Sequence, residues 1–125
     1  MADAARVLGR DAREYPGRLD TVPTPPGCDH VTMTSDEVTA LCPITGQPDW
    51  YTVQIEYVPG ERIVESKSLK LFFGSLRDQG HFCEALAPLI AREVQDAASP
   101  RQITVSVTQK PRGGITITAR ATLDA

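Results

Sequence analysis

One short loop, CPITGQPD at residues 42–49, holds a thiol and a carboxyl together just ahead of a predicted strand. Proline and glycine restrict the backbone path of such a loop, so the side chains of Cys42 and Asp49 are held in place. A constrained thiol can act as a nucleophile, and a nearby carboxyl can donate a proton. The alternatives are a buried structural cysteine and an aspartate that only forms a turn.

A second segment, ESKSLKLFF at residues 65–73, contributes two cations. Lys67 and Lys70 are three residues apart and share one face of a predicted helix. Ser66 and Ser68 lie near the start of that helix, where free backbone N–H groups favour anions. The segment predicts a cradle for a phosphate-bearing cofactor, and the alternative is a solvated lysine face on an amphipathic helix.

Two further charged residues have both a functional and a structural interpretation. Glu84 lies in the first turn of the second predicted helix, where its carboxylate can accept a pair of N–H donors from a purine-like ring edge or interact with the helix dipole. Arg112, in PRGG at residues 111–114, can reach a phosphate or cap a hairpin turn.

A metal site is a weaker hypothesis. Cys28-x-His30 and His81-x-Cys83 supply four zinc-type ligands. Single-residue spacing is unusual for such pairs, and in a helix it points the two side chains to opposite sides. We therefore predict that no metal is bound.

The bulk composition is that of an ordinary globular protein. The chain has 125 residues, 41% hydrophobic and 23% charged, which fits one domain. A net charge of −3 gives no sign of the surplus of clustered basic residues that nucleic-acid binding requires. No segment has the length and hydropathy of a membrane span. The three cysteines cannot all pair internally, and in a reducing compartment an odd cysteine is a candidate nucleophile, ligand or core residue more than a disulfide partner. We expect a cytoplasmic protein that binds neither nucleic acid nor membranes.

The hydropathy pattern predicts an irregular, proline-bearing N-terminal arm over residues 1–29 and a single catalytic domain over residues 30–125. Alternation of apolar and polar residues predicts strands, and helical spacing of apolar residues predicts helices. The predicted strands cover 31–34 (a short edge strand), 51–57, 62–65, 103–107 and 115–119, and the predicted helices cover 66–77 and 82–99. We expect residues 35–48 to be mostly loop, and Pro88 to kink the second helix or displace its start.

The resulting order, strand-strand-helix-helix-strand-strand, predicts an α+β fold: a four-stranded antiparallel sheet with two helices on one face. Four strands leave unpaired edges, and closing the sheet into a barrel of several subunits would remove them. We therefore expect a homo-oligomer.

Four motifs together resemble the QueF family, the NADPH-dependent nitrile reductases of queuosine biosynthesis. They are CPITGQPD at 42–49, ESKSLKLFF at 65–73, GHFCEA at 80–85 and PRGG at 111–114. The resemblance covers roughly residues 20 to 115 and implies the tunnelling fold (T-fold), with oligomeric barrels and active sites between subunits. The implied reaction reduces the nitrile of 7-cyano-7-deazaguanine to 7-aminomethyl-7-deazaguanine with two NADPH, on the route to a modified tRNA base.

The resemblance also implies roles for individual residues. Cys42 would attack the nitrile carbon to form a covalent thioimide, Asp49 would protonate the nitrogen, and Glu84 would bind the base edge. The other implied substrate-binding residues are Cys83, Glu65 and Ser66. The implied NADPH-binding residues are Lys67, Ser68, Lys70 and Arg112.

The sequence departs from the family pattern at Cys83, where the short members usually carry a histidine. This departure leaves open which group orients the imine intermediate, and whether Cys83 forms a disulfide with Cys42. It also makes conceivable a T-fold relative that binds the nitrile base, or forms the thioimide, without NADPH turnover. Two enzymes of the same fold are rival functions: an amidinotransferase that acts on tRNA and lacks the lysine-serine signature, and a zinc-dependent cyclohydrolase.

Overall fold

The computed structural model describes residues 5–7 and 13–125. Its secondary structure consists of six strands, two α-helices and one 3₁₀ helix. In chain order they are β1 (Thr21–Pro23), β2 (Val31–Leu41), β3 (Pro48–Val58), β4 (Arg62–Val64), α1 (Ser66–Ser75), η1 (Leu76–Asp78), α2 (Cys83–Ala98), β5 (Gln102–Arg112) and β6 (Ile115–Asp124).

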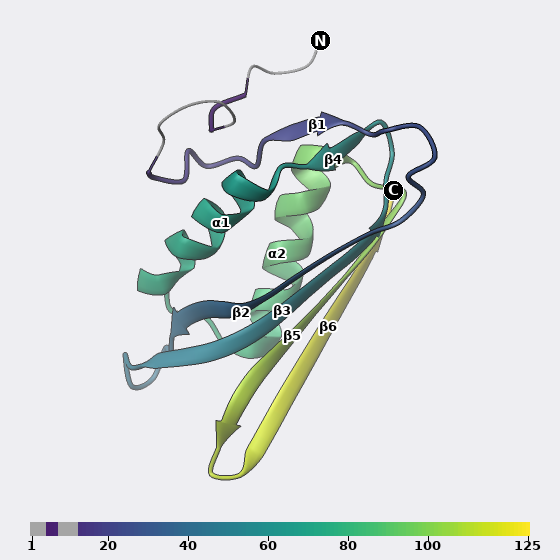
Figure 1. Cartoon of the computed structure of the whole chain (residues 1–125). Coiled ribbons are helices and arrows are strands. Elements are labelled where there is room, and N and C mark those ends of the chain that lie inside the picture. The colour runs from purple at the N-terminus through teal and green to yellow at the C-terminus, as the bar shows by residue number, and fades with distance from the viewer. Residues whose placement is uncertain (1–4, 8–12) are drawn as a thin grey trace.

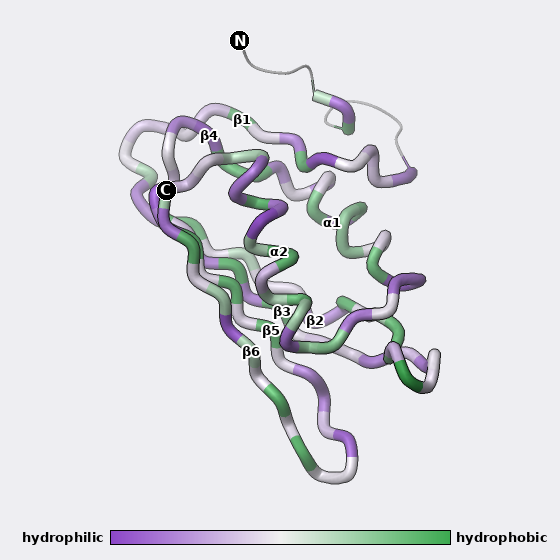
Figure 2. Tube along the Cα trace, turned by 180° about the vertical axis from the view of Figure 1, so that it is seen from behind, coloured by the Kyte–Doolittle hydropathy of each residue, from purple (hydrophilic) through white to green (hydrophobic). Residues whose placement is uncertain are grey.

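The main sheet has four antiparallel strands in the order β2-β3-β5-β6, and both α-helices pack on one of its faces (Figure 1). This arrangement confirms the predicted fold class. The core consists of the strand residues that face the helices and the apolar faces of the helices; β3 alone contributes Tyr51, Val53, Ile55 and Tyr57. Figure 2 shows the alternation of hydrophobic and hydrophilic residues along β5 and β6.

Two strand predictions were wrong. Residues 35–48 are not mostly loop, because β2 continues to Leu41 and pairs with β3 along almost its whole length. A register shift between Ser35 and Val38 interrupts its period-two pattern, which concealed the strand. The predicted strand at 62–65 is β4, but it pairs with β1 instead of joining the main sheet, where β2 takes the fourth place.

Helix α1 begins at a side-chain cap. The carboxylate of Glu65 accepts hydrogen bonds from the backbone N–H groups of Lys67 (2.7 Å) and Ser68 (2.8 Å), which satisfies two of the free donors at the helix start. Helix α2 runs through Pro88, at its sixth residue, instead of starting after it. It ends at Ser99, whose backbone is left-handed (φ 47°).

The N-terminal segment is attached to α1 through Asp20. Its buried carboxylate accepts from the N–H groups of Arg6 (2.9 Å) and Val7 (2.6 Å). Its own N–H donates to the hydroxyl of Ser68 (3.0 Å). Part of the predicted arm is therefore hydrogen-bonded to the folded domain, and Leu19 belongs to the core.

The β5–β6 hairpin closes at Gly113 and Gly114, both at positive φ (59° and 77°). Two consecutive residues with positive φ fit the tight turn that matches the twist of the two strands. The hairpin extends beyond the ends of the helices (Figure 1), and this geometry places Arg112 at the end of the sheet near residues 42–49.

Candidate active site

The Cys42 loop is held at both ends by backbone hydrogen bonds. Leu41 donates its N–H to the Gln79 carbonyl (2.9 Å) and accepts from the N–H of His81 (3.0 Å), which ties the loop to the segment before α2. Within the loop, the Cys42 N–H donates to the Gln47 carbonyl (2.8 Å), and the Cys42 carbonyl accepts from the Gly46 N–H (2.9 Å). The cysteine therefore lies on a closed turn.

Donors around the Cys42 sulfur lower the pKa of its thiol to about 7. The largest contribution is a hydrogen bond from the Thr45 side chain, followed by the backbone N–H groups of Thr45 and Ile44; the Arg112 side chain adds a smaller one. The Thr45 hydroxyl also accepts from the Gln47 N–H (3.2 Å), which leaves its proton for the sulfur. Donors of this kind stabilise the nucleophilic thiolate.

Arg112 bridges the two reactive groups predicted from the loop. Its guanidinium contacts the Asp49 carboxylate at 2.8 Å, and hydrogen bonds to Cys42, together with the Asp49 charge, raise the pKa of Arg112. The Asp49 side chain is only 7% exposed, whereas that of Arg112 is 50% exposed. The structure thus brings Cys42, Asp49 and Arg112 together.

Cys83 has a different environment. Its thiol is buried and donates to the Val107 carbonyl (3.4 Å), so it faces the core under β5. Burial, and to a lesser degree the charge of Glu84, raises the pKa of this thiol. Glu84 itself is exposed in the first turn of α2. Its position allows contact with a ligand, and the Cys83 thiol lies beneath that surface.

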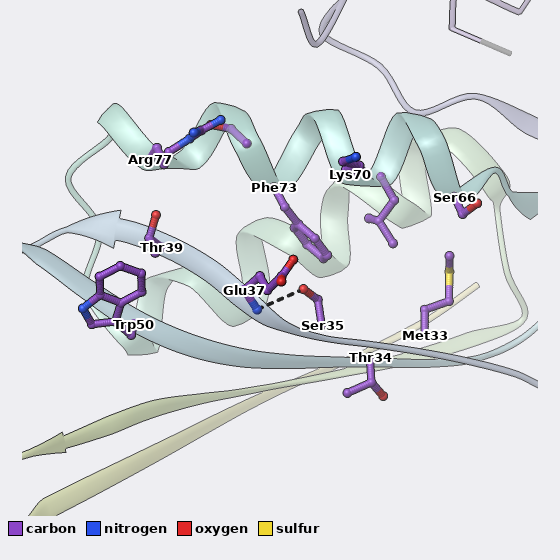
Figure 3. Close-up of a pocket in the computed structure, with 12 residues that line it drawn as sticks. Met33, Thr34, Ser35, Glu37, Thr39, Trp50, Ser66, Lys70, Phe73 and Arg77 are labelled. Carbon is purple, nitrogen blue, oxygen red and sulfur yellow. Dashed lines mark hydrogen bonds between the residues drawn. The ribbon is translucent and has the colours of Figure 1, made fainter. Parts of the chain in front are cut away.

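A groove of about 740 Å³ runs between α1 and β2 (Figure 3). Ser66 and Lys70 line it, together with Arg77 of η1 and Trp50 of β3. Lys67 is exposed on α1. Among the described residues, neither Cys42 nor Arg112 belongs to the lining.

Ser68 is fully buried, and its hydroxyl donates to the Glu65 carbonyl (2.8 Å) while accepting from Asp20. The predicted cofactor residues are thus distributed over a buried position, the surface of α1 and the Cys42 loop region.

Trp50 links the groove to the Cys42 region. It is 54% exposed, and besides the groove it lines a small cavity of about 130 Å³ with Asp49 and Arg112. Because it lines both, Trp50 marks the point where the two surfaces meet.

Three residues of this region were not predicted from sequence as site residues: Thr45, Trp50 and Tyr51. Thr45 lies in the loop motif itself, three residues after the cysteine, so its spacing was a usable signal. Trp50 and Tyr51 lie in a strand whose alternation indicated only packing.

With this geometry established, comparisons with known proteins define the family. The family model described as QueF-like protein matches residues 48–125. A protein of Frankia casuarinae named NADPH-dependent 7-cyano-7-deazaguanine reductase is 42% identical over 119 residues, which cover 95% of each chain. A protein of the same name from Syntrophus aciditrophicus is 45% identical, over 92% of this chain and 83% of that protein. The chain belongs to the QueF family.

A structural comparison supports the fold. The crystal structure of the archaeosine synthase QueF-Like in the apo form matches with a TM-score of 0.71, covering 75% of this chain and 92% of that one. At 23% identity this likeness establishes the shared T-fold only.

Metal-ligating side chains are scattered in this fold. Within residues 5–7 and 13–125, no three His, Cys, Asp or Glu side chains are grouped to hold a metal ion. No helix in that part of the chain has the length and hydropathy to cross a membrane.

Proposed function

We propose that this protein reduces the nitrile of 7-cyano-7-deazaguanine to 7-aminomethyl-7-deazaguanine, with consumption of two NADPH, in queuosine biosynthesis. Family membership and the names of the relatives support this proposal. The observation that carries it is the Cys42 thiol with a pKa of about 7 beside the Asp49–Arg112 pair. A nitrile carbon is an electrophile that a thiolate attacks directly.

The covalent step uses two residues. As Cys42 Sγ bonds to the nitrile carbon, one carbon–nitrogen bond opens and its electron pair moves to nitrogen. Asp49, whose carboxylate pairs with Arg112, would take up the proton that the Cys42 thiol loses and pass it to the nitrogen, which makes the product a neutral thioimide. Arg112, in contact with both groups, would hold the Cys42 sulfur and the Asp49 carboxylate at a fixed position relative to each other. The adduct anchors the substrate between two rounds of cofactor binding.

NADPH supplies the hydride for each of the two reductions. The exposed Lys67 and Lys70 and the groove next to them suit a phosphate-bearing molecule by charge and by size. Arg112 is a further candidate cation, and its contacts with Asp49 favour a position near the reacting end. For Ser68 we propose an indirect role through the start of α1, because its hydroxyl is buried.

The substrate base would be bound at the N-terminal end of α2. Glu84, exposed in the first turn of α2, would accept two N–H donors from the guanine-like edge. Glu65 and Ser66 lie at the start of α1, near the other end of this chain's α2 (Figure 1), so they are further candidates only as residues of a second copy. Cys83 would contribute from beneath through packing, because its thiol is bonded to a core carbonyl.

We further propose a homo-oligomeric barrel in which the active sites lie between subunits. Among the residues that the structure describes, four large apolar side chains are exposed, and each lies near the Cys42 region: Ile44 in the loop, Trp50, Phe82 before α2, and Ile115 opposite Arg112 in the hairpin. A second copy that covers them would exclude water and bring another α1 toward Cys42. The free state of all three cysteines favours a reducing compartment such as the cytoplasm.

The test follows the absorbance of NADPH with purified protein and 7-cyano-7-deazaguanine, alongside the Cys42→Ala variant. We expect two NADPH oxidised per nitrile, and no oxidation by the variant. Oxidation that survives in Cys42→Ala would refute the nucleophile. A Cys42 adduct without NADPH oxidation would instead support a relative that captures the nitrile and does not reduce it.

A further inference from the structure

Tyr51 carries a polar atom that nothing in the fold explains. Its side chain is fully buried, and its hydroxyl is the buried side-chain oxygen without a hydrogen-bond partner among the described residues. Buried polar groups are nearly always paired, so an unpaired one calls for a functional explanation or a missing ligand.

The position of Tyr51 indicates which ligand. It lies on β3 two residues after Asp49, so both side chains project from the same face of the sheet. The charges that act on its hydroxyl are those of Asp49, Cys83, Cys42 and Arg112, all of which belong to the Cys42 region. The hydroxyl therefore lies within electrostatic range of the groups that we propose to act on the nitrile.

The hydroxyl is suited to donate a hydrogen bond. Burial, with the neighbouring Asp49 charge, raises the pKa of Tyr51, so the group stays protonated at neutral pH. The buried Cys83 thiol nearby is already bonded to the Val107 carbonyl. Tyr51 thus provides a proton-bearing group without a competing acceptor among the described residues.

A second tyrosine of the same strand provides a comparison. Tyr57 is also buried and projects from the same face of β3, but its hydroxyl accepts from the Val64 N–H at 2.9 Å. The buried hydroxyl of Tyr57, whose role is structural, thus has a hydrogen-bond partner, whereas that of Tyr51 has none among the described residues.

We propose that the Tyr51 hydroxyl donates a hydrogen bond to the nitrogen of the imine intermediate and holds it in the site until the second hydride arrives. The inference rests on the proposed function. When the first hydride adds to the thioimide carbon, the carbon–sulfur bond breaks and its electron pair leaves with Cys42 Sγ as thiolate. The neutral imine that remains has no covalent anchor, and its nitrogen is a hydrogen-bond acceptor.

The test compares Tyr51→Phe with the matched control Tyr57→Phe. An imine that escapes adds water, loses ammonia and becomes an aldehyde. For Tyr51→Phe we expect normal thioimide formation, a fall from two toward one NADPH per nitrile, aldehyde among the products, and amine formation slowed roughly tenfold or more. We expect an unchanged or higher Tm, because the change removes an unpaired polar atom. Tyr57→Phe should keep two NADPH per nitrile and lose about 3 °C or more in Tm.

Three results would overturn the inference: amine formation by Tyr51→Phe at the wild-type rate, aldehyde released equally by Tyr57→Phe, or a Tm loss in Tyr51→Phe that matches the control. If the wild-type protein oxidises no NADPH, the proposed function fails and the inference with it. Failure of the inference alone requires a wild-type protein that makes the amine.

Discussion

The lowered pKa of the Cys42 thiol depends on the donors around its sulfur, of which the Thr45 hydroxyl contributes most. Glycine at position 46, with φ 69°, allows the turn that presents these donors. Asp49 is buried beside them and Arg112 spans the two. At this scale the site is a set of short-range hydrogen bonds, and single substitutions should separate their contributions.

Thr45→Val should raise the pKa of Cys42 from about 7 toward the ordinary range of a thiol, because it removes the largest stabilising hydrogen bond. A lowered pKa keeps the thiol ionised above about pH 7, so the variant's reactivity profile should move to higher pH. Peptide-level measurement of Cys42 alkylation against pH checks this, with Thr45→Ser as the control that keeps the hydroxyl. A Thr45→Val profile that coincides with the wild type would contradict it.

Arg112→Ala should slow thioimide formation by roughly tenfold, because the substitution removes the link between the nucleophile and the acid. In a double-mutant cycle with Asp49→Asn the two effects should not add, since the side chains are 2.8 Å apart. Rapid-quench mass spectrometry of the adduct measures both. A variant that forms the adduct normally but has a raised KM for NADPH would assign Arg112 to the cofactor alone.

At the scale of the elements, two helix starts determine the layout of the site. Glu65 caps α1 and places the exposed lysines on its outer face. The start of α2 places Glu84 outward and Cys83 inward. Ser68 connects the first of these starts to the N-terminal segment through Asp20.

Ser68→Ala should lower the free energy of unfolding by about 1–3 kcal/mol, since it removes the buried hydroxyl that accepts from the Asp20 N–H. Ser66→Ala, at an exposed position of the same turn, should change it by less than about 0.5 kcal/mol. Denaturant titration measures both. Unchanged stability of Ser68→Ala together with a raised KM for NADPH would instead favour direct contact with the cofactor.

The sequence predicted the elements with strict periodicity and missed those whose pattern is interrupted. Alternation from Tyr51 to Tyr57 correctly indicated a half-buried strand, whereas the bulge in β2 concealed most of that strand. The pairing of β4 with β1 depends on tertiary packing, which no local pattern of three residues reveals.

The site followed the same division. The loop motif predicted Cys42 and Asp49 as catalytic residues, whereas the period-two pattern of the strand indicated only that Tyr51 is buried. The contact between Arg112 and Asp49 spans sixty-three residues and required the fold to be known.

At the scale of the whole molecule, the main sheet leaves two edge strands, β2 and β6, without a second partner strand among the described residues. The unpaired edges and the exposed apolar side chains around Cys42 are the observations behind our proposal that further copies complete the structure. Charge repulsion between copies should be small, because the net charge of the chain is only −3.

We expect sedimentation to show an assembly of several chains. Ile115→Glu, which places a charge at a 65% exposed apolar position of the hairpin, should weaken that assembly and reduce turnover at least roughly tenfold in dilute enzyme. Thr116→Glu, next to it and also exposed, is the matched control. A fully active monomer, for the wild type or for Ile115→Glu, would contradict this account.

The most direct test of the central claim is the mass of the intact protein and of its peptides after incubation with 7-cyano-7-deazaguanine, before and after NADPH is added. The account predicts a mass gain of one nitrile molecule per chain on the peptide that contains Cys42, with none in Cys42→Ala, and release of the adduct as the amine when NADPH arrives. No adduct on Cys42 in a protein that nonetheless makes the amine would contradict the claim that this cysteine is the nucleophile.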